Sequence, residues 1–301
     1  MSAGEQRSWC LFASAGDNNA IHLWLDGTAR RQWDLVVGYH GDSDHEFSEI
    51  SKLSLHTFRA KGGKFQILKK FVAQKPQFFD RYSYVWVCDD DIQMSAAQIE
   101  EAFSIAESFQ FWVAQPALRP EGKHDHPITI YAGPQCDYRA VNFIEVNMPI
   151  FRRDTLIEFL AVFDGSLTGW GIDWWYMNVF GAHKLGRFRN FFNSVELGRY
   201  AIIDKVPVTN PHDEAKGGRE IDKLEPVTLR EAAWKKVMAK YGLVEFRQSV
   251  FASCTIASNR NARAAVTRFD VARQIAIVLA RRLARKFGTW RLFSAPCNVG
   301  R

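Results

Sequence analysis

Three consecutive aspartates, Asp89-Asp90-Asp91, directly follow an apolar run at residues 82–88. Side chains alternate along an extended backbone, so we expect Asp89 and Asp91 to share one direction and Asp90 to take the other. Neighbouring carboxylates repel one another unless water or a cation neutralises them. Mg²⁺ and Mn²⁺ prefer oxygen ligands, and an ion held by one or two carboxylates keeps positions for phosphate oxygens. The triplet therefore predicts a divalent-metal site.

A turn or a helix cap is the competing interpretation of the triplet. The cap, however, is already supplied by Ser95 and Gln98, which form a Ser-x-x-Gln capping box before the next helical pattern. The triplet is then left without a structural task at a strand end. We predict that Asp89 and Asp91 are metal ligands and that Asp90 contacts the bound cofactor or substrate.

Asp173 lies in a second motif, Gly-Trp-Gly-Ile-Asp-Trp-Trp at residues 169–175. The motif coincides with the expected start of a helix, where the helix dipole and free N–H groups favour aspartate for structural reasons alone. Trp170, Trp174 and Trp175 are candidates for stacking on a sugar ring, although core packing is expected for at least one of them.

Two basic segments are candidates for binding phosphate. Lys-Gly-Gly-Lys at residues 61–64 precedes a helix whose free N–H groups, together with Lys64, would form an anion site. The spacing of a Walker loop is absent. A later loop with Lys216 and Arg219 could close on a diphosphate through a forked arginine contact, and a solvated turn is the alternative.

The order of elements predicts an α/β fold. Strands are expected at residues 9–14, 33–39, 82–88, 111–115, 142–151 and 200–208, and helices at 65–74, 99–109, 154–163 and 172–180. This alternation favours a mostly parallel central sheet flanked by helices, with ligands bound beyond the carboxyl ends of the strands. Residues 119–138 lack periodicity and are rich in proline and glycine, so we expect a long loop there.

These motifs resemble the GT-A-type glycosyltransferases. An Asp-x-Asp at the end of a buried strand, some eighty residues into an α/β chain, is similar to their metal-binding signature. The ordered set also resembles a plant and bacterial family of unknown function with glycosyltransferase-like motifs, over about residues 10–225. It consists of KGGK (61–64), VWVCDDD (85–91), QPAL (115–118), FIE (143–145), GWGID (169–173) and His212 with GGR (217–219). The resemblance implies a Rossmann-like GT-A fold.

The resemblance also implies roles for individual residues. Asp173 matches the carboxylate that serves as general base in inverting members, whereas in a retaining enzyme it would position the substrate. Glu145, which shares a face of the expected strand 142–151 with Asn147, is the second candidate base.

Other residues match the family's metal and nucleotide positions. His212 matches a late histidine that completes the metal shell in many GT-A proteins; a purely structural histidine is the alternative. Asp17 and either Asp42 or Asp44 lie at early strand ends, where the nucleotide's base or ribose would bind.

The combined prediction is a metal-dependent glycosyltransferase, using Mn²⁺ or Mg²⁺, that moves a sugar from a nucleotide-sugar donor to a hydroxyl acceptor in polysaccharide or glycolipid synthesis. One alternative is a non-catalytic carbohydrate- or nucleotide-binding protein with the same fold. The other is a metal-dependent phosphoester hydrolase, which would need more clustered His and Asp ligands than the sequence offers.

The net charge of +6 is unevenly distributed. Residues 259–301 contain ten Lys or Arg and one Asp, a net of +9, which leaves −3 on residues 1–258. We therefore divide the chain into a domain at 1–258 and a C-terminal basic amphipathic helical tail at 259–301. The tail either lies on an anionic membrane surface, as a lipid-linked acceptor would favour, or packs on the domain. A basic tail on an acidic body does not indicate a nucleic-acid partner.

Cysteine usage and the N-terminus bear on location. The five cysteines are odd in number and form no Cys-x-x-Cys pair, so we expect reduced, mostly buried thiols rather than disulfides or a zinc site. Residues 1–8 are polar, unlike a signal peptide, and no apolar run approaches the length of a membrane span. These features predict a cytoplasmic protein, with the tail as a route to peripheral contact with the cytoplasmic membrane face.

Overall fold

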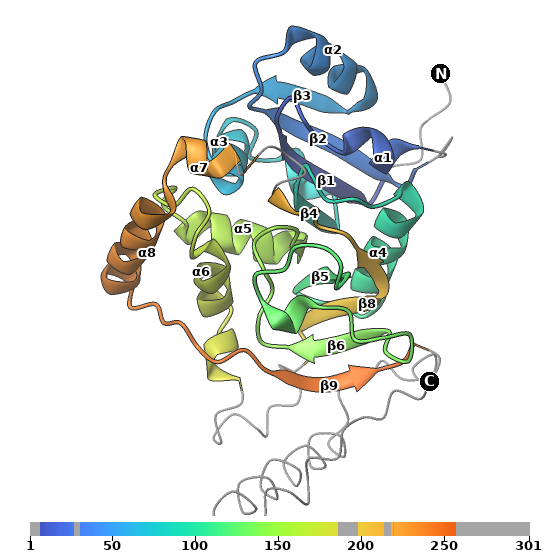
Figure 1. Ribbon diagram of the computed structural model, residues 1–301, viewed down its shortest axis with the longest axis vertical. Coiled ribbons are helices and arrows are strands. Elements are labelled where there is room, and N and C mark those ends of the chain that lie inside the picture. The colour runs from blue at the N-terminus through green and yellow to red at the C-terminus, as the bar shows by residue number, and fades with distance from the viewer. Residues whose placement is uncertain (1–6, 27–30, 186–197, 214–217, 219, 257–301) are drawn as a thin grey trace, which may run out of the picture.

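Nine strands form one sheet in the order β3-β2-β1-β4-β7-β5-β8-β6-β9 (Figure 1). The computed structural model describes residues 7–26, 31–185, 198–213, 218 and 220–256. The strands are β1 Trp9–Ala15, β2 Trp33–Tyr39, β3 His56–Arg59, β4 Tyr84–Asp89, β5 Val113–Leu118, β6 Tyr138–Val141, β7 Ile150–Arg152, β8 Tyr200–Val208 and β9 Val250–Cys254.

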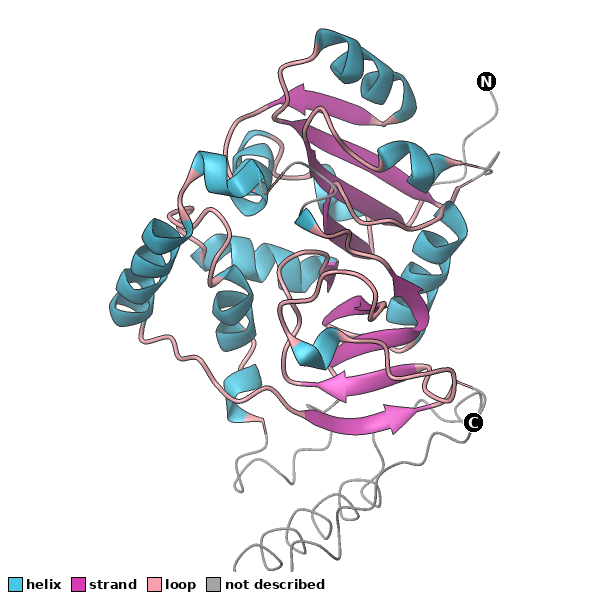
Figure 2. Cartoon of the chain, viewed as in Figure 1, coloured by secondary structure: helices cyan, strands magenta, loops and turns pink. Residues whose placement is uncertain are grey.

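Helices cover both faces of the sheet (Figure 2). They are α1 Ile21–Leu25, α2 Asp44–Leu53, α3 Lys64–Gln74, α4 Ala96–Ser108, α5 Arg153–Val162, α6 Ile172–Val179, α7 Glu220–Leu224 and α8 Val227–Tyr241, with short 3₁₀ turns η1 Phe78–Arg81, η2 Pro127–Thr129 and η3 Ala182–Lys184. The predicted capping box is confirmed at α4, where the Ser95 hydroxyl accepts from the Gln98 N–H and the Gln98 side chain accepts from the Ser95 N–H.

The sheet is mixed, so the predicted mostly parallel sheet is wrong in its second half. The pairings β1–β2, β1–β4, β2–β3 and β5–β8 are parallel. By contrast, β7 runs antiparallel to β4 and β5, and β6 runs antiparallel to β8 and β9. Neither β6 nor β7 follows a helical crossover, and a parallel pairing needs such a crossover to bring the chain back to the same edge.

Alternate residues of the central strands bury opposite faces of the sheet. Phe12 and Val87 belong to the core beneath α3, α5, α6 and α8, whereas Leu11 and Trp86 belong to the core beneath α1 and α4. Burial on both faces explains why β1 and β4 appear in the sequence as nearly continuous apolar runs.

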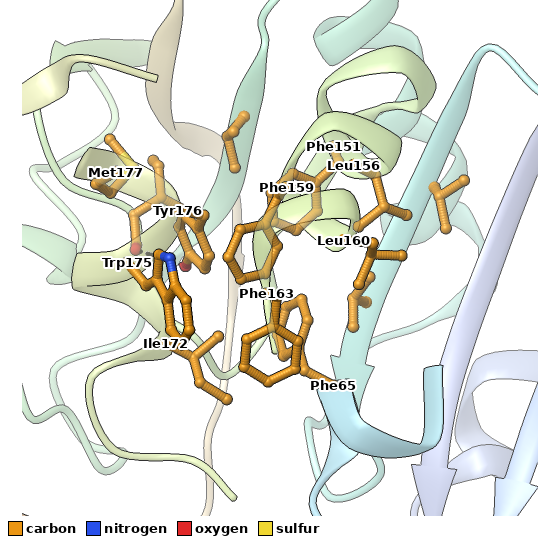
Figure 3. Close-up of a cluster of buried hydrophobic side chains, with 14 of the residues drawn as sticks. Phe65, Phe151, Leu156, Phe159, Leu160, Phe163, Ile172, Trp175, Tyr176 and Met177 are labelled. Atoms are coloured by element: carbon orange, nitrogen blue, oxygen red, sulfur yellow. Dashed lines mark hydrogen bonds between the residues drawn. The ribbon is translucent and has the colours of Figure 1, made fainter. Parts of the chain in front are cut away.

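An aromatic cluster fixes the position of α6 (Figure 3). Phe65 of α3 meets Phe159 of α5 edge-on at 5.7 Å between ring centroids, and Phe159 meets Tyr176 of α6 at 5.6 Å. The Tyr176 hydroxyl then donates to the carbonyl of Ile144, at 2.7 Å. The cluster thereby joins α6, which carries Asp173, to the loop that carries Glu145.

That loop corrects a second prediction. Residues 142–151 do not form one strand, because β6 ends at Val141 and β7 begins at Ile150. Residues 142–149 connect strands that lie three places apart in the sheet, and Phe143 and Ile144 pack into the core beneath α3, α5 and α6. Glu145 and Asn147 therefore lie in a buried loop rather than on one face of a strand.

Several other predictions concern the chain as a whole. Cys10, Cys88 and Cys136 are free and buried and Cys254 is free and half-buried, as expected. Within the described part of the chain, no helix is both long and apolar enough to span a bilayer. The predicted tail at 259–301 lies outside the described residues, so its amphipathic helix, its membrane contact and the cytoplasmic location stay predictions.

Candidate functional site

Asp89 ends β4 and is held by a buried lysine. Lys64, the first residue of α3, places its Nζ 2.8 Å from Asp89 Oδ1 and donates to the carbonyl oxygens of Val146 and Asn147, at 2.8 and 2.7 Å. The Asp89 N–H donates to the same Asn147 carbonyl, at 2.8 Å. The three protons of the Lys64 ammonium thus each have an acceptor. Lys64 joins α3, the end of β4 and the 142–149 loop, rather than presenting its protons to an anion as predicted.

Gly63, the residue before Lys64, makes this arrangement possible. A Cβ at position 63 would lie 2.0 Å from the carbonyl oxygen of Thr168, so only glycine allows α3 to start this close to the segment leading into α6. The glycines of the Lys-Gly-Gly-Lys motif therefore serve close packing at Gly63.

Asp90 and Asp17 organise the ends of the first two strands. Asp90 accepts a hydrogen bond from the Gly16 N–H, at 2.8 Å, and so turns away from Asp89 toward β1.

Asp17 accepts from the Tyr39 hydroxyl and from the N–H groups of Asp42 and Ser43, and these bonds lower its pKa. The structure therefore brings the predicted Asp17 and Asp42 together, with Asp42 paired to Lys61 at 2.7 Å.

Glu145 is a buried carboxyl group with an unusual charge environment. It is 5% exposed, and its pKa rises to about 8 because of burial and because Asp125, Asp173 and Asp89 repel a further negative charge. Its backbone N–H donates to Gln115 Oε1, at 2.6 Å. This environment favours the protonated form of the Glu145 carboxyl, which can donate a hydrogen bond.

Asp173 lies in the first turn of α6 and is also buried. Burial raises its pKa to about 7, although the N–H groups of Trp174 and Val146 stabilise its charged form. The Trp174 N–H donates to Asp173 Oδ1, at 2.8 Å. A carboxylate that titrates near neutral pH is suited to general base catalysis.

Gly171 allows Asp173 to enter the helix at this place. Gly171 has a φ of +86°, and a Cβ there would lie 2.3 Å from the Trp234 ring. Left-handed backbone and close approach to an aromatic ring both require glycine.

Three polar atoms near Glu145 have no hydrogen-bond partner. They are Oε2 of Glu145 and both amide atoms of Asn147, all fully buried. The backbone of both residues is fixed by hydrogen bonds, from the Glu145 N–H to Gln115 and from Lys64 to the Asn147 carbonyl oxygen. Buried polar atoms without partners are costly and uncommon in proteins, so a bound polar ligand would satisfy them.

His126 is a residue that the sequence interpretation missed. Its Nε2 lies 4.0 Å from Asp173 Oδ2, and its Nδ1 lies 2.7 Å from Nε2 of Gln248. The ring packs on Phe143 with centroids 4.6 Å apart. No local motif marks His126, because its partners lie far away in the sequence.

The predicted metal-ligand set is only partly compatible with the structure. His212 is exposed, and its Nε2 lies 3.2 Å from the Glu121 carbonyl oxygen. Among the described residues no group of three or more His, Cys, Asp or Glu side chains is arranged to hold a metal ion. Asp89 is 43% exposed in its side chain at the strand end. The residues therefore do not fit a shell that includes His212, and Asp89 and Asp91 stay predicted ligands.

The remaining predicted residues are two basic loop residues and three tryptophans. Lys216 and Arg219 lie outside the described residues. Trp175 is buried in the core, Trp174 packs between Phe143 and Phe246, and Trp170 is 42% exposed. Trp170 is thus the most exposed of the three tryptophans, Trp174 is half-buried, and Trp175 is core.

Solved structures of similar arrangement include S. aureus TarS and GalNAc-T7. TarS 1-349 in complex with UDP-GlcNAc has a TM-score of 0.47 at 11% identity, covering 75% of this chain and 66% of that one. A longer TarS chain has a TM-score of 0.46 at 11% identity, covering 68% and 37%. GalNAc-T7 with UDP, GalNAc and Mn²⁺ has a TM-score of 0.46 at 12% identity, covering 68% and 43%.

These likenesses concern the arrangement of the sheet and its helices. This chain spans less than two thirds of the length of each of these three structures. No family model and no curated protein matches it, so the resemblance to the plant and bacterial family is not confirmed. At this identity, substrate, metal and site residues have to be argued from the side chains of this chain.

Proposed function

We propose that this protein is a glycosyltransferase that uses a nucleotide-sugar donor, with Asp173 as the general base. The observation that carries the proposal is the 142–149 loop, which links a strand-end carboxylate to a buried base. Asn147 accepts from the Asp89 N–H, and the Val146 N–H stabilises the Asp173 carboxylate. Glycosyl transfer with inversion needs the leaving diphosphate and the attacking hydroxyl on opposite sides of the sugar, so the proposal is for an inverting enzyme.

The side chains of the loop would hold the sugar between these two ends. The protonated Glu145 carboxyl can donate a hydrogen bond, and the Asn147 amide can donate and accept. Hydroxyl groups of a sugar ring are matching partners for all three unpaired atoms. Asp173, once ionised, would remove the proton of the acceptor hydroxyl as the oxygen attacks the anomeric carbon.

A divalent ion bound by Asp89 and Asp91 would neutralise charge on the leaving nucleoside diphosphate. The similar structures TarS and GalNAc-T7 are glycosyltransferases, and both were solved with UDP. UDP and UDP-sugars are therefore the first probes to use here.

The test is the turnover of a panel of UDP-sugars with Mn²⁺, measured as release of UDP, in wild type and Asp173→Asn. We expect the variant to lose at least about 100-fold in kcat while its Kd for UDP stays within about twofold. Asp154→Asn, at the start of α5 and paired with Arg152, is the matched control and should behave as wild type. Wild-type turnover in Asp173→Asn would sink the assignment of Asp173 as the base, whereas binding of UDP without any turnover by wild type would favour the non-catalytic binding protein.

The phosphoester hydrolase gains no support from the geometry. Such an enzyme needs clustered ligands for its metal ions, and the described residues contain no such cluster. Release of phosphate from a simple phosphomonoester, with no turnover of UDP-sugars, would support the hydrolase instead of the glycosyltransferase.

A further inference from the structure

His126 lies opposite the candidate base on a loop that is firmly anchored. His126 directly precedes η2, and Arg139 donates to the carbonyl oxygen of Ile128 within η2 and to that of Ile130 just after it, at 2.9 and 2.7 Å. Arg139 in turn forms a buried two-point pair with Asp204, at 2.8 and 3.0 Å. A bidentate pair of this kind restricts both partners strongly, so the position of His126 is defined by the fold rather than by a free loop.

The hydrogen bond to Gln248 determines which ring nitrogen of His126 carries the proton. The amide nitrogen of Gln248 lies 2.7 Å from Nδ1, and an amide nitrogen can only donate. Nδ1 is then the acceptor, so the neutral ring carries its proton on Nε2. Burial lowers the pKa of His126, which keeps the ring neutral at pH 7. The N–H on Nε2 therefore faces Oδ2 of Asp173.

The separation between these two atoms fits one intervening oxygen. At 4.0 Å, Nε2 and Oδ2 are too far apart for a direct hydrogen bond, which needs about 2.7–3.2 Å. An oxygen at about 2.8 Å from each would subtend an angle of roughly 90°, which the lone pair and proton of a hydroxyl can accommodate. The arrangement presents one donor and one acceptor, the complement of a single hydroxyl group.

We propose that His126 and Asp173 together bind the attacking hydroxyl of the acceptor, which makes His126 an acceptor-binding residue. This inference rests on the proposed function. The hydroxyl accepts from His126 Nε2–H and donates to Asp173 Oδ2. During transfer its proton moves to Asp173 and its oxygen forms the bond to the anomeric carbon. The bond from that carbon to the diphosphate oxygen breaks, with its electron pair leaving on the diphosphate, and His126 keeps its proton.

Other charged groups act on the His126–Asp173 pair from neighbouring segments. Glu245, after α8, raises the pKa of Asp173, and Asp173 raises that of Glu145 on the neighbouring loop. Asp125, the residue before His126, opposes the effect of burial on the imidazole. The His126 imidazole places its Nε2 4.0 Å from Asp173 Oδ2.

The activity test uses water as the acceptor probe, in the hydrolysis of UDP-GlcNAc and other UDP-sugars by the full chain with Mn²⁺. His126→Phe removes the donor and should lower kcat by about 10- to 100-fold, with the Kd for UDP within twofold of wild type. His126→Gln places an N–H near the position of Nε2 and should recover most of the rate. His124→Phe, an exposed histidine on the same loop, is the matched control.

A second measurement does not depend on turnover. Nitrogen-15 spectra of the imidazole rings, with His126 assigned by its loss in His126→Gln, report which nitrogen is protonated. We expect the Nε2–H form in wild type, and loss of that preference in Gln248→Leu. A proton on Nδ1 in wild type would overturn the inference, because Nε2 could not then donate.

The outcomes separate the two proposals. If wild type binds UDP and hydrolyses UDP-sugars but His126→Phe keeps the wild-type rate, the role of His126 is refuted and the proposed function stands. If wild type neither binds UDP nor turns over any UDP-sugar, both proposals fall together.

Discussion

Burial raises the pKa of both central carboxyl groups, Glu145 and Asp173, which lie on neighbouring segments. The N–H groups of Trp174 and Val146 oppose this rise at Asp173, whose pKa is raised to about 7, whereas Oε2 of Glu145 has no hydrogen-bond partner and the pKa of Glu145 is raised to about 8. The N–H contacts favour the charged form of Asp173, which a base requires, and their absence at Oε2 of Glu145 favours the protonated form, which can donate a hydrogen bond.

The base assignment predicts how the rate depends on pH. Because only ionised Asp173 accepts a proton, kcat/KM for UDP-sugar hydrolysis should rise with pH and level off above about 7, near its pKa. Initial rates between pH 5 and 9 would show this limb, and Asp154→Asn should keep it. A flat profile across this range, with the protein folded throughout, contradicts the assignment.

The raised pKa of Glu145 predicts that the free energy of unfolding falls as the pH rises, whereas the rate that depends on Asp173 increases with pH. Its folded-state pKa of about 8 lies above its usual 4.5, so its favourable contribution is complete below about pH 4.5 and is lost as the pH rises through 8. Glu145→Gln cannot ionise. Relative to wild type, this variant should therefore gain stability between pH 5 and 9, by up to a few kcal/mol at about 1.4 kcal/mol per pKa unit.

Urea unfolding of both proteins at pH 5 and pH 9 checks this expectation. Glu158→Gln, exposed on α5, is the matched control and should show no such change. If the free energies of unfolding of wild type and Glu145→Gln differ by the same amount at the two pH values, the raised pKa of Glu145 is contradicted.

The residues of the site differ in how far the sequence could reveal them. Asp89, Asp173 and Glu145 stand in compact motifs, so a local pattern was enough to nominate them. His126 was missed because its partners Gln248 and Asp173 come from other segments, with Gln248 122 positions away. The role of Lys64 was misjudged for the same reason, since its acceptors belong to β4 and to a loop more than 80 residues later.

At the scale of elements, Lys64 is the contact that fastens α3 to β4 and to the 142–149 loop. Replacing it with methionine would leave the Asp89 carboxylate and two carbonyl groups without their shared donor. We expect Lys64→Met to lower the free energy of unfolding by about 2–4 kcal/mol, because breaking a buried ion pair leaves an uncompensated charge.

Chemical denaturation measures this loss, and Lys70→Met provides the comparison. Lys70 is exposed on the same helix, so its replacement should change stability by no more than about 0.5 kcal/mol. Similar small changes in both variants would show that Lys64 is not the fastening contact.

The elements that the sequence predicted well are those with a strong periodic pattern. β2 and β8 have the predicted bounds, and α3, α5 and α6 lie within a residue or two of them. The 142–151 segment was misjudged because its apolar residues pack against a helix layer while it crosses the sheet, which produces a strand-like pattern without strand pairing. The sequence thus indicated that the segment with Glu145 and Asn147 belongs to the candidate site, but it assigned that segment to a strand instead of a loop.

At the scale of the whole molecule, the alternation of strands and helices predicted an α/β sheet but not the direction of every strand. The four strands β1 to β4 are joined through helices and pair in parallel, as the pattern indicates. The directions of β6 and β7 depend on how long loops return to the sheet, and periodicity holds no information about that. The carboxyl ends of β1, β2, β4 and β8 nevertheless meet at one edge, which is why the strand-end motifs lie near one another in the candidate site.

Ligand binding couples this edge to the stability of the whole chain, and this yields a test of the metal assignment. A ligand at about 100 times its Kd stabilises the folded state by about 2.7 kcal/mol. UDP with Mn²⁺ should therefore raise Tm by several degrees, and more than UDP alone. The part of the shift that needs Mn²⁺ should disappear in Asp89→Asn and Asp91→Asn. It should persist in His212→Ala, because His212 contacts the Glu121 carbonyl instead of forming a ligand cluster with the triplet.

Thermal unfolding of wild type and these three variants, with UDP, with Mn²⁺ and with both together, tests this expectation. Loss of the Mn²⁺-dependent shift in His212→Ala would restore the histidine to the metal shell, and would mean that the 209–213 segment moves toward Asp91 when the ion binds.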